Sequence, residues 1–139
     1  MNNALSGLRV LDLTHMLSGP YCTMILGDMG AEMIKVEPIA GEGTRKLLAT
    51  DPEHSIDGMG AYFITLNRNK KSIAIDLKSE DGLALFYSLV EQADIVVNNY
   101  AAGVPEKLKI DYPRLAEINP RWTKSCARHG GRGPDTTRS

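Results

Sequence analysis

The loop that follows residues 8–13 carries the residue types of an anion-binding site. Residues 8–13 are rich in apolar side chains and are expected to form a buried strand. Ser18 is typical of a helix N-cap, and Pro20 suits the first helical turn. The N–H groups at such a helix start bind phosphates and carboxylates in α/β proteins, so the segment predicts an anionic, nucleotide-like ligand. A capped helix start that binds nothing is the alternative.

Charged residues near other expected strand ends offer further contacts to such a ligand. Lys70 and Lys71, beside Arg68, can neutralise phosphates or form a solvated basic turn. Lys78 is a better phosphate candidate, because it follows the end of an expected strand. Glu37 can bind a ribose hydroxyl, as acids do in dinucleotide folds, or be a solvated strand end. We favour the solvated strand end.

Aromatic and imidazole side chains add a second kind of chemistry. Tyr100 follows an expected strand and can stack on adenine, a contact worth about 1–3 kcal/mol, or belong to the core. Asn99 beside it can bond a base or a phosphate. A lone histidine such as His15 is more often a structural hydrogen-bonding group than a catalyst. His54 and His129 have no partners at metal-ligand spacing, so we expect no metal site.

The elements that would position these residues alternate along the chain. We expect strands at 8–13, 33–36, 72–77 and 95–97, with residues 67–71 as a basic turn. One helix is expected from the N-cap Ser18 to a stop at Gly30, with Cys22 on its side that faces the protein core. Another is expected to begin after the N-cap Ser79. Short helices are expected at 105–108 and 113–118, and a long loop at 39–60 with one helical turn at 44–48. Alternating strands and helices predict an α/β fold with a mostly parallel sheet.

Composition limits the class of protein. The chain has 139 residues and a formal net charge of −1, so no bulk positive field favours nucleic acid or an anionic membrane. No signal peptide or membrane-spanning run is apparent, and two cysteines fit a reducing cytosol, so we expect a cytoplasmic protein. Residues 122–139 hold four basic residues and one acidic residue, a net charge of +3. We expect a folded region at 1–121 and a divergent, disordered basic tail at 122–139.

Several motifs in this order resemble the opening of class III CoA-transferases, the family of formyl-CoA transferase, carnitine CoA-transferase and α-methylacyl-CoA racemase. The resemblance covers roughly residues 5–121, and no single motif is specific without the others. The motifs are Leu11-Asp12-Leu13-Thr14, Ser18-Gly19-Pro20, Asp28-Met29-Gly30-Ala31-Glu32, Ile34-Lys35-Val36-Glu37-Pro38, Asn67-Arg68-Asn69-Lys70-Lys71, Asp76-Leu77-Lys78, Ala93-Asp94-Ile95-Val96-Val97, Asn99-Tyr100 and Asn119-Pro120-Arg121.

The resemblance implies a Rossmann-like, mostly parallel sheet flanked by helices, here a truncated N-terminal part of a larger interlocked-dimer fold. It implies coenzyme A as a substrate, with acyl-CoA and a small carboxylic acid as the reacting partners. By matching position, the CoA-binding residues are His15, Leu17, Ser18, Ile75, Asp76, Leu77, Lys78, Asn99, Tyr100, Ala101 and Lys107. Family members form homodimers, and a chain of this length cannot complete that topology, so we expect exposed apolar surface.

The sequence departs from the family pattern at two places. Pro38 stands where some members have an arginine, which puts one adenosine contact in doubt. Residues 122–129 do not read as the buried strand that the family has there. The resemblance also implies a catalytic aspartate that forms an acyl-enzyme anhydride, and no aspartate here matches it, so we assign no catalytic residue and leave enzyme activity open. Alternatives are an acyl-CoA racemase fragment, an NAD-type dinucleotide-binding domain and a truncated product without function.

Overall fold

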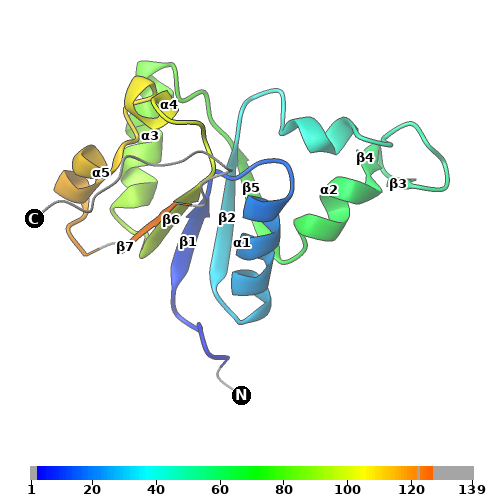
Figure 1. Ribbon diagram of the computed structural model, residues 1–139, viewed down its shortest axis with the longest axis horizontal. Helices are drawn as coiled ribbons and strands as arrows, with labels where there is room; N and C mark the ends of the chain where they lie inside the picture. Colours follow the sequence, from blue (N-terminus) through cyan, green and yellow to red (C-terminus); the bar gives the residue numbers. More distant parts are fainter. Residues whose placement is uncertain (1–2, 122, 127–139) are drawn as a thin grey trace, which may run out of the picture.

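A five-stranded sheet forms the centre of the computed structural model, which describes residues 3–121 and 123–126 (Figure 1). Its strands are β1 (Arg9–Asp12), β2 (Glu32–Glu37), β5 (Lys70–Ala74), β6 (Ile95–Asn98) and β7 (Thr123–Cys126). The strand order is β5-β2-β1-β6-β7, and every neighbouring pair is parallel. Counted along the chain, this is the order 3-2-1-4-5 of a Rossmann-type sheet. The predicted α/β class with a Rossmann-like parallel sheet is confirmed.

Helices cover both faces of the sheet. Helix α1 (Ser18–Asp28) connects β1 to β2, and α3 (Glu80–Val90) connects β5 to β6. Two short helices, α4 (Val104–Lys107) and α5 (Tyr112–Ile118), precede β7. In Figure 1, α1 lies to the right of β2, whereas α3 and α5 lie at the left, on the other side of the sheet.

The strands are buried on both faces, so neighbouring residues of one strand enter different clusters. Val10 packs with Met33 and Val97 in the cluster beneath α1. Leu11 packs with Phe86 of α3 in the larger cluster on the opposite face. This alternation with a period of two is expected where helices cover both faces of a parallel sheet.

A side arm leaves the sheet between β2 and β5. It contains a 3₁₀ helix η1 (Gly43–Lys46), a hairpin of β3 (Ser55–Ile56) and β4 (Met59–Gly60), and helix α2 (Ala61–Leu66). Asp57 and Gly58 connect the two short strands with positive φ angles of 50° and 73°, as a two-residue hairpin of this kind requires. The arm lies at the right of Figure 1, next to α1 and β5. The predicted loop at 39–60 therefore contains the expected helical turn and also a hairpin.

Several expectations about local structure are wrong. Ser18 is the first residue of α1, and Leu17 occupies the N-cap without a side-chain hydrogen bond. The third strand of the sheet is β5 at 70–74, earlier than the expected 72–77, so Lys70 lies in a strand and not in a turn. Cys22 is exposed on α1. The N-cap at Ser79 is confirmed, because its hydroxyl accepts from Gly82 N–H at 3.0 Å.

The expectation for the C-terminal segment is wrong in one part. Residues Thr123–Cys126 form β7, which pairs in parallel with β6, where a disordered tail was expected from residue 122. Ladder hydrogen bonds depend on the backbone, so a polar segment can extend a sheet edge. The rest of the predicted tail, residues 122 and 127–139, lies outside the described residues, and the boundary at 121 stays a prediction.

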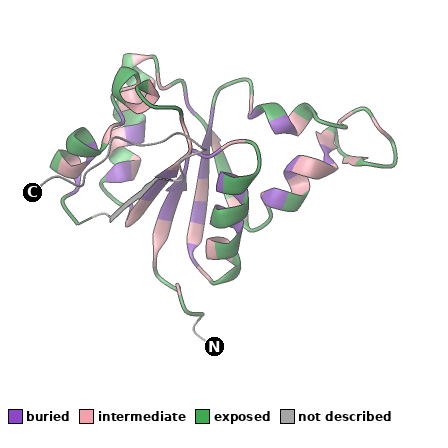
Figure 2. Cartoon of the chain, viewed as in Figure 1, coloured by how far each residue is buried: buried purple, intermediate pink, exposed green. Residues whose placement is uncertain are grey.

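The outward side of α1 is apolar. Leu17, Tyr21 and Ile25 are 55%, 52% and 39% exposed, and they recur every four residues along one helix face. Figure 2 shows exposed residues along this side of the helix.

Within the described part of the chain, no helix is long and apolar enough to cross a membrane.

Phe86 offers a direct test of this core. It is fully buried and packs between α3 and the sheet, so Phe86→Ala should lower the free energy of unfolding by about 3–5 kcal/mol. The neighbouring Leu85 is 47% exposed, and Leu85→Ala should change stability by less than about 0.5 kcal/mol. Urea unfolding followed by circular dichroism measures both values. Equal losses for the two variants would contradict this arrangement of α3.

Candidate functional site

The carboxyl ends of β1 and β6 meet where the strand order reverses. From β1 the chain continues to β2 on one side, and from β6 it continues toward β7 on the other. The two strands are directly paired, and Leu13 N–H donates to Val97 O at 2.8 Å. In open α/β sheets, ligands bind outside the carboxyl ends of strands at this reversal point. The loop after β1 and the segment after β6 are therefore the candidate site.

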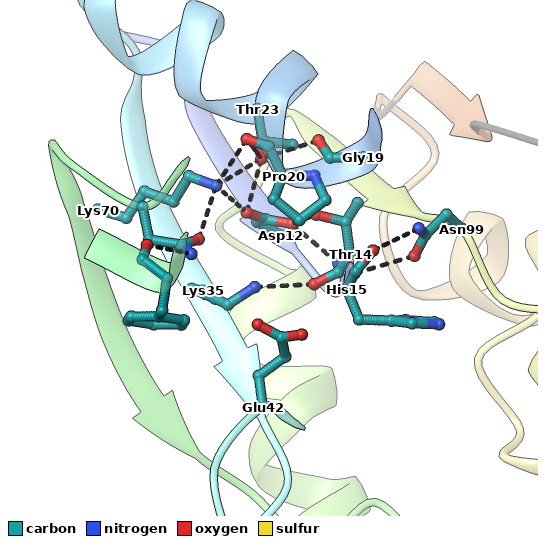
Figure 3. A network of polar contacts seen from close by, with 12 residues as sticks. Asp12, Thr14, His15, Gly19, Pro20, Thr23, Lys35, Glu42, Lys70 and Asn99 are labelled. Carbon is teal, nitrogen blue, oxygen red and sulfur yellow. Dashed lines mark hydrogen bonds and ion pairs between the residues drawn. The ribbon is translucent and has the colours of Figure 1, made fainter. Parts of the chain in front are cut away.

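Side chains from other elements bind the backbone of the loop after β1. Asn99 accepts from His15 N–H at 3.0 Å and donates to His15 O at 2.7 Å (Figure 3). Lys35 of β2 is 1% exposed and donates to Thr14 O at 2.8 Å. The Asn99 amide, predicted to contact the ligand, thus holds the loop that would carry the ligand.

Beneath this loop lies a buried carboxylate. Asp12 is fully buried at the end of β1, and one of its oxygens accepts from Thr14 N–H at 2.9 Å and from the Thr14 hydroxyl. Its other oxygen accepts from the Thr23 hydroxyl at 2.7 Å and from Lys70 Nζ at 2.9 Å. Lys70 also donates to Pro20 O at 3.0 Å. The carboxylate thereby connects β1 to both α1 and β5.

Burial and charge act in opposite directions on Lys70. Burial lowers the pKa of the Lys70 ammonium, while the charge of Asp12 and its hydrogen bond raise it. Both side chains are at most 1% exposed. Removing one partner of an ion pair that is buried from solvent leaves the other charge uncompensated, which destabilises the fold.

Gly19 allows α1 to begin directly against β1. A Cβ atom at Gly19 would lie 2.6 Å from Thr14 Cβ and 3.2 Å from Asn99 Cγ, closer than van der Waals contact permits. A glycine at this helix start thus permits the close approach of helix and strand, as glycines do in nucleotide-binding α/β folds. The first turn of α1 lies beside Asn99 for this reason.

Two aromatic rings adjoin the loop. The His15 and Tyr100 rings lie 5.5 Å apart between centroids, with their planes tilted by 38°. Burial raises the pKa of the Tyr100 phenol above its usual value, and the charge of Asp12 raises it further. Tyr100 therefore stays protonated at neutral pH and can donate a hydrogen bond. Leu17 and Ser18, at the start of α1, are exposed on the same loop.

The predicted residues after β5 form a separate group. Two strand spacings separate β5 from β1, which is about 10 Å in a sheet. Ile75 is 3% exposed in the core, and the partly buried Leu77 packs against that core. Asp76 accepts from Lys78 N–H at 3.0 Å and shapes the turn into α3. Of this group, the Asp76 and Lys78 side chains are exposed.

Ala101 and Lys107 complete the predicted set. Ala101 directly follows Tyr100 and is exposed, and Lys107 is exposed at the end of α4. The structure thus brings His15, Asn99 and Tyr100 into contact, with Leu17, Ser18 and Ala101 adjoining them in the chain.

Glu37 is not the solvated strand end that the sequence analysis favoured. It is 4% exposed, and Arg45 of η1 binds it through Nε at 3.0 Å and through Nη2 at 2.7 Å. Ser72 donates to it at 2.7 Å, and the Arg45 guanidinium lies 3.9 Å from the centre of the Phe63 ring. This acid therefore fastens the side arm to the sheet and is engaged by protein groups where a dinucleotide fold would present it to ribose.

Sequence reasoning assigned no role in the site to Asp12 or Lys35, nor to Glu42, whose carboxylate accepts from Met16 N–H at 3.2 Å in the same loop. The available signal was a charged residue inside an apolar strand pattern, as in Leu11-Asp12-Leu13 and Ile34-Lys35-Val36. A charge at a position that should be buried indicates a paired internal group. Across the residues that the structure describes, no cluster of three or more His, Cys, Asp or Glu side chains could hold a metal ion.

A hollow of about 260 Å³ lies at the opposite, amino edge of the sheet. Its charged groups have protein partners, since Arg9 Nε donates to Glu32 at 2.6 Å and the backbone N–H of Arg9 donates to Asp94 at 2.8 Å. It adjoins the starts of β1 and β2, away from the carboxyl ends where ligands of such folds bind. We therefore place the candidate site at the other edge.

Removing the buried ammonium tests the role of the Asp12 network. Lys70→Met should leave the Asp12 carboxylate uncompensated and lower the free energy of unfolding by about 3–5 kcal/mol. The matched control is Lys71→Met, which removes an exposed pair with Glu32 and should cost less than about 1 kcal/mol. Chemical denaturation compares the two, and a small loss at Lys70 would show that the pair is dispensable.

The Glu37 ion pair predicts a dependence of stability on acid. Burial opposes ionisation of Glu37, but hydrogen bonds from Arg45 and Ser72 outweigh it, so the pKa lies below the ordinary 4.5. The stabilisation is therefore fully present above about pH 4.5 and is lost as the pH falls through the folded-state pKa. As the pH falls below 4.5, the unfolding free energy should therefore fall more steeply for wild type than for Glu37→Gln. Glu53→Gln, at an exposed residue of the same arm, should keep the wild-type slope.

Comparisons with known proteins identify the family of this chain. The profile of CoA-transferase family III matches residues 5–139, which extends the resemblance beyond residue 121. A succinyl-CoA:mesaconate CoA-transferase of Haloarcula hispanica is 46% identical over 132 residues, covering 92% of this chain and 32% of that protein. A formyl-CoA:oxalate CoA-transferase of Rhodopseudomonas palustris is 40% identical over 135 residues, covering 96% of this chain and 31% of that protein.

Solved structures give the same result. A CAIB/BAIF family protein from Brucella suis superposes with a TM-score of 0.82 at 37% identity, covering 91% of this chain and 33% of that one. A hypothetical protein from Mycobacterium tuberculosis superposes with a TM-score of 0.83 at 34% identity, covering 95% and 36%. This chain spans about a third of the length of the curated relatives it matches. From the profile match, the relatives and the shared fold, we conclude that the chain belongs to CoA-transferase family III.

Proposed function

We propose that this chain binds coenzyme A as the CoA-binding part of a CoA-transferase, which moves CoA between an acyl-CoA and a small carboxylic acid. The observation that carries the proposal is the contact of His15 with Asn99 and Tyr100 at the reversal point of the sheet. Nucleotide-like ligands bind at such points in α/β folds. Membership of a family named for CoA transfer supplies the ligand.

The parts of CoA correspond to different groups of the site. Tyr100 offers an aromatic face on which adenine can stack. The N–H groups at the start of α1, beside Leu17 and Ser18, suit a phosphate because the helix dipole favours negative charge there. Lys78 and Lys107 are exposed cations that can neutralise the remaining phosphates.

The resemblance to class III CoA-transferases supports further parts of the proposal. Transfer would proceed through a carboxylate that attacks the thioester, and we assign that carboxylate to no residue of this chain. We therefore propose that this chain binds the ligand, and we assign catalytic turnover to the longer fold that the relatives have. On the same basis we propose a cytoplasmic location and, for the complete fold, a homodimer.

The dinucleotide alternative has less support. Its ribose-binding acid would be Glu37, which is buried beneath Arg45 and Ser72. Its phosphate loop would need the pattern G-x-G-x-x-G, and the loop after β1 has the single glycine Gly19. Isothermal titration calorimetry of the full chain with CoA and with NADH separates the two functions. Saturable binding of CoA supports our proposal, and binding of NADH without competition by CoA would overturn it.

Tyr100 is the residue whose loss should affect CoA most directly. Tyr100→Ala should weaken CoA binding by about 1–3 kcal/mol, because a stacking partner of adenine is removed. The control is Tyr112→Ala, at an exposed tyrosine on α5, which should leave the CoA dissociation constant unchanged. Calorimetric titration measures both constants. An unchanged constant for Tyr100→Ala would show that this ring does not contact the ligand.

A further inference from the structure

The last residue of the loop before the N-cap of α1 has an unusual backbone conformation. Met16 has a φ of 69°, in the left-handed region that residues other than glycine rarely adopt. Its side chain is 56% exposed, so packing of that side chain does little to impose this conformation. A non-glycine residue in this region costs on the order of 1 kcal/mol and persists only where surrounding contacts enforce it.

A side chain of the side arm contacts this residue. Glu42 is 6% exposed, and one of its carboxylate oxygens accepts from Met16 N–H at 3.2 Å and from Thr44 N–H at 3.4 Å. The other oxygen accepts from the Thr44 hydroxyl. Glu42 follows Met16 by 26 residues and lies just before η1. The arm thus reaches back to the turn that starts α1.

The contacts to the loop are divided among three side chains. Lys35 binds Thr14 O, Asn99 binds both backbone groups of His15, and Glu42 binds the next N–H along the chain. The arm itself is fastened to the sheet separately, by the ion pair of Arg45 with Glu37 of β2. Loss of the Glu42 carboxylate should therefore release the Met16 turn without detaching the arm.

We propose that Glu42 is a positioning residue that holds Met16 in its left-handed turn and so sets the start of α1 for the anionic ligand. This role rests on the proposed function, because the ligand it serves is CoA. A carboxylate accepting a backbone N–H forms one of the stronger hydrogen bonds in proteins. Without it, only a fraction of molecules would hold the binding-competent loop, and the apparent affinity would fall by that fraction.

The experiment compares the CoA affinity of variants of the full chain, measured by calorimetry. Glu42→Ala should weaken CoA binding about tenfold, the effect expected for a lost hydrogen bond to a charged group. Glu42→Gln keeps an oxygen that accepts from Met16 N–H and should stay near wild type. Met16→Gly, added to Glu42→Ala, should restore affinity to within about threefold of wild type, because glycine adopts positive φ without strain. The control Glu53→Ala, at an exposed acid of the arm, should bind as wild type does.

The outcomes separate this inference from the proposed function. Unchanged affinity in Glu42→Ala overturns the inference, and so does a loss that Met16→Gly leaves in place, since that loss would reflect damage elsewhere. If wild type binds no CoA, the proposed function fails, and amide hydrogen exchange at Met16 decides the positioning role alone. Faster exchange of this amide in Glu42→Ala, but not in Glu53→Ala, supports the role. Equal exchange in wild type and Glu42→Ala overturns it.

Discussion

The buried carboxylate of Asp12 is the constraint on which the candidate site at the carboxyl ends of the strands depends. It lies at the end of the central strand, fully removed from solvent, and binds groups from the following loop, from α1 and from β5. A charge in such a position is costly unless every lone pair finds a donor, so the surrounding donors are fixed in place by the same requirement. One side chain thereby determines how a strand, a helix and a distant strand meet.

The loop above this carboxylate is held by other groups of the protein. Its successive backbone groups are bound by Lys35 and Asn99, and Gly19 lets the helix start against Thr14. A site that is already ordered loses little conformational entropy on binding, which favours affinity. Polar side chains that sequence patterns assign to ligand binding can thus bind the protein backbone instead. Asn99 is the example: its amide holds His15, and the ring of Tyr100 next to it remains half-buried.

Sequence reasoning predicted the parts of the fold that depend on local pattern. The strand around Leu11 and the cap at Ser79 are confirmed, because burial period and capping chemistry are encoded within a few residues. The start of β5 was missed because Lys70 and Lys71 suggest solvent, whereas Lys70 finds its partner Asp12 58 residues away in sequence. The hairpin in the arm had a readable signal in Asp57-Gly58. β7 had no such signal, since backbone pairing to β6 specifies it.

The side arm has a consequence for how the chain can vary. It departs from β2 and returns to β5, two neighbouring parallel strands, so its length is not tied to their register. Arg45 secures the base of the arm, whereas the hairpin turn at Asp57-Gly58 lies beyond that attachment. Residues added at the hairpin tip would extend outward from the sheet. The entropic cost of closing the longer loop grows only slowly with its length. The tip is therefore a natural place for inserting a reporter peptide or an entire foreign domain while the sheet keeps its pairing.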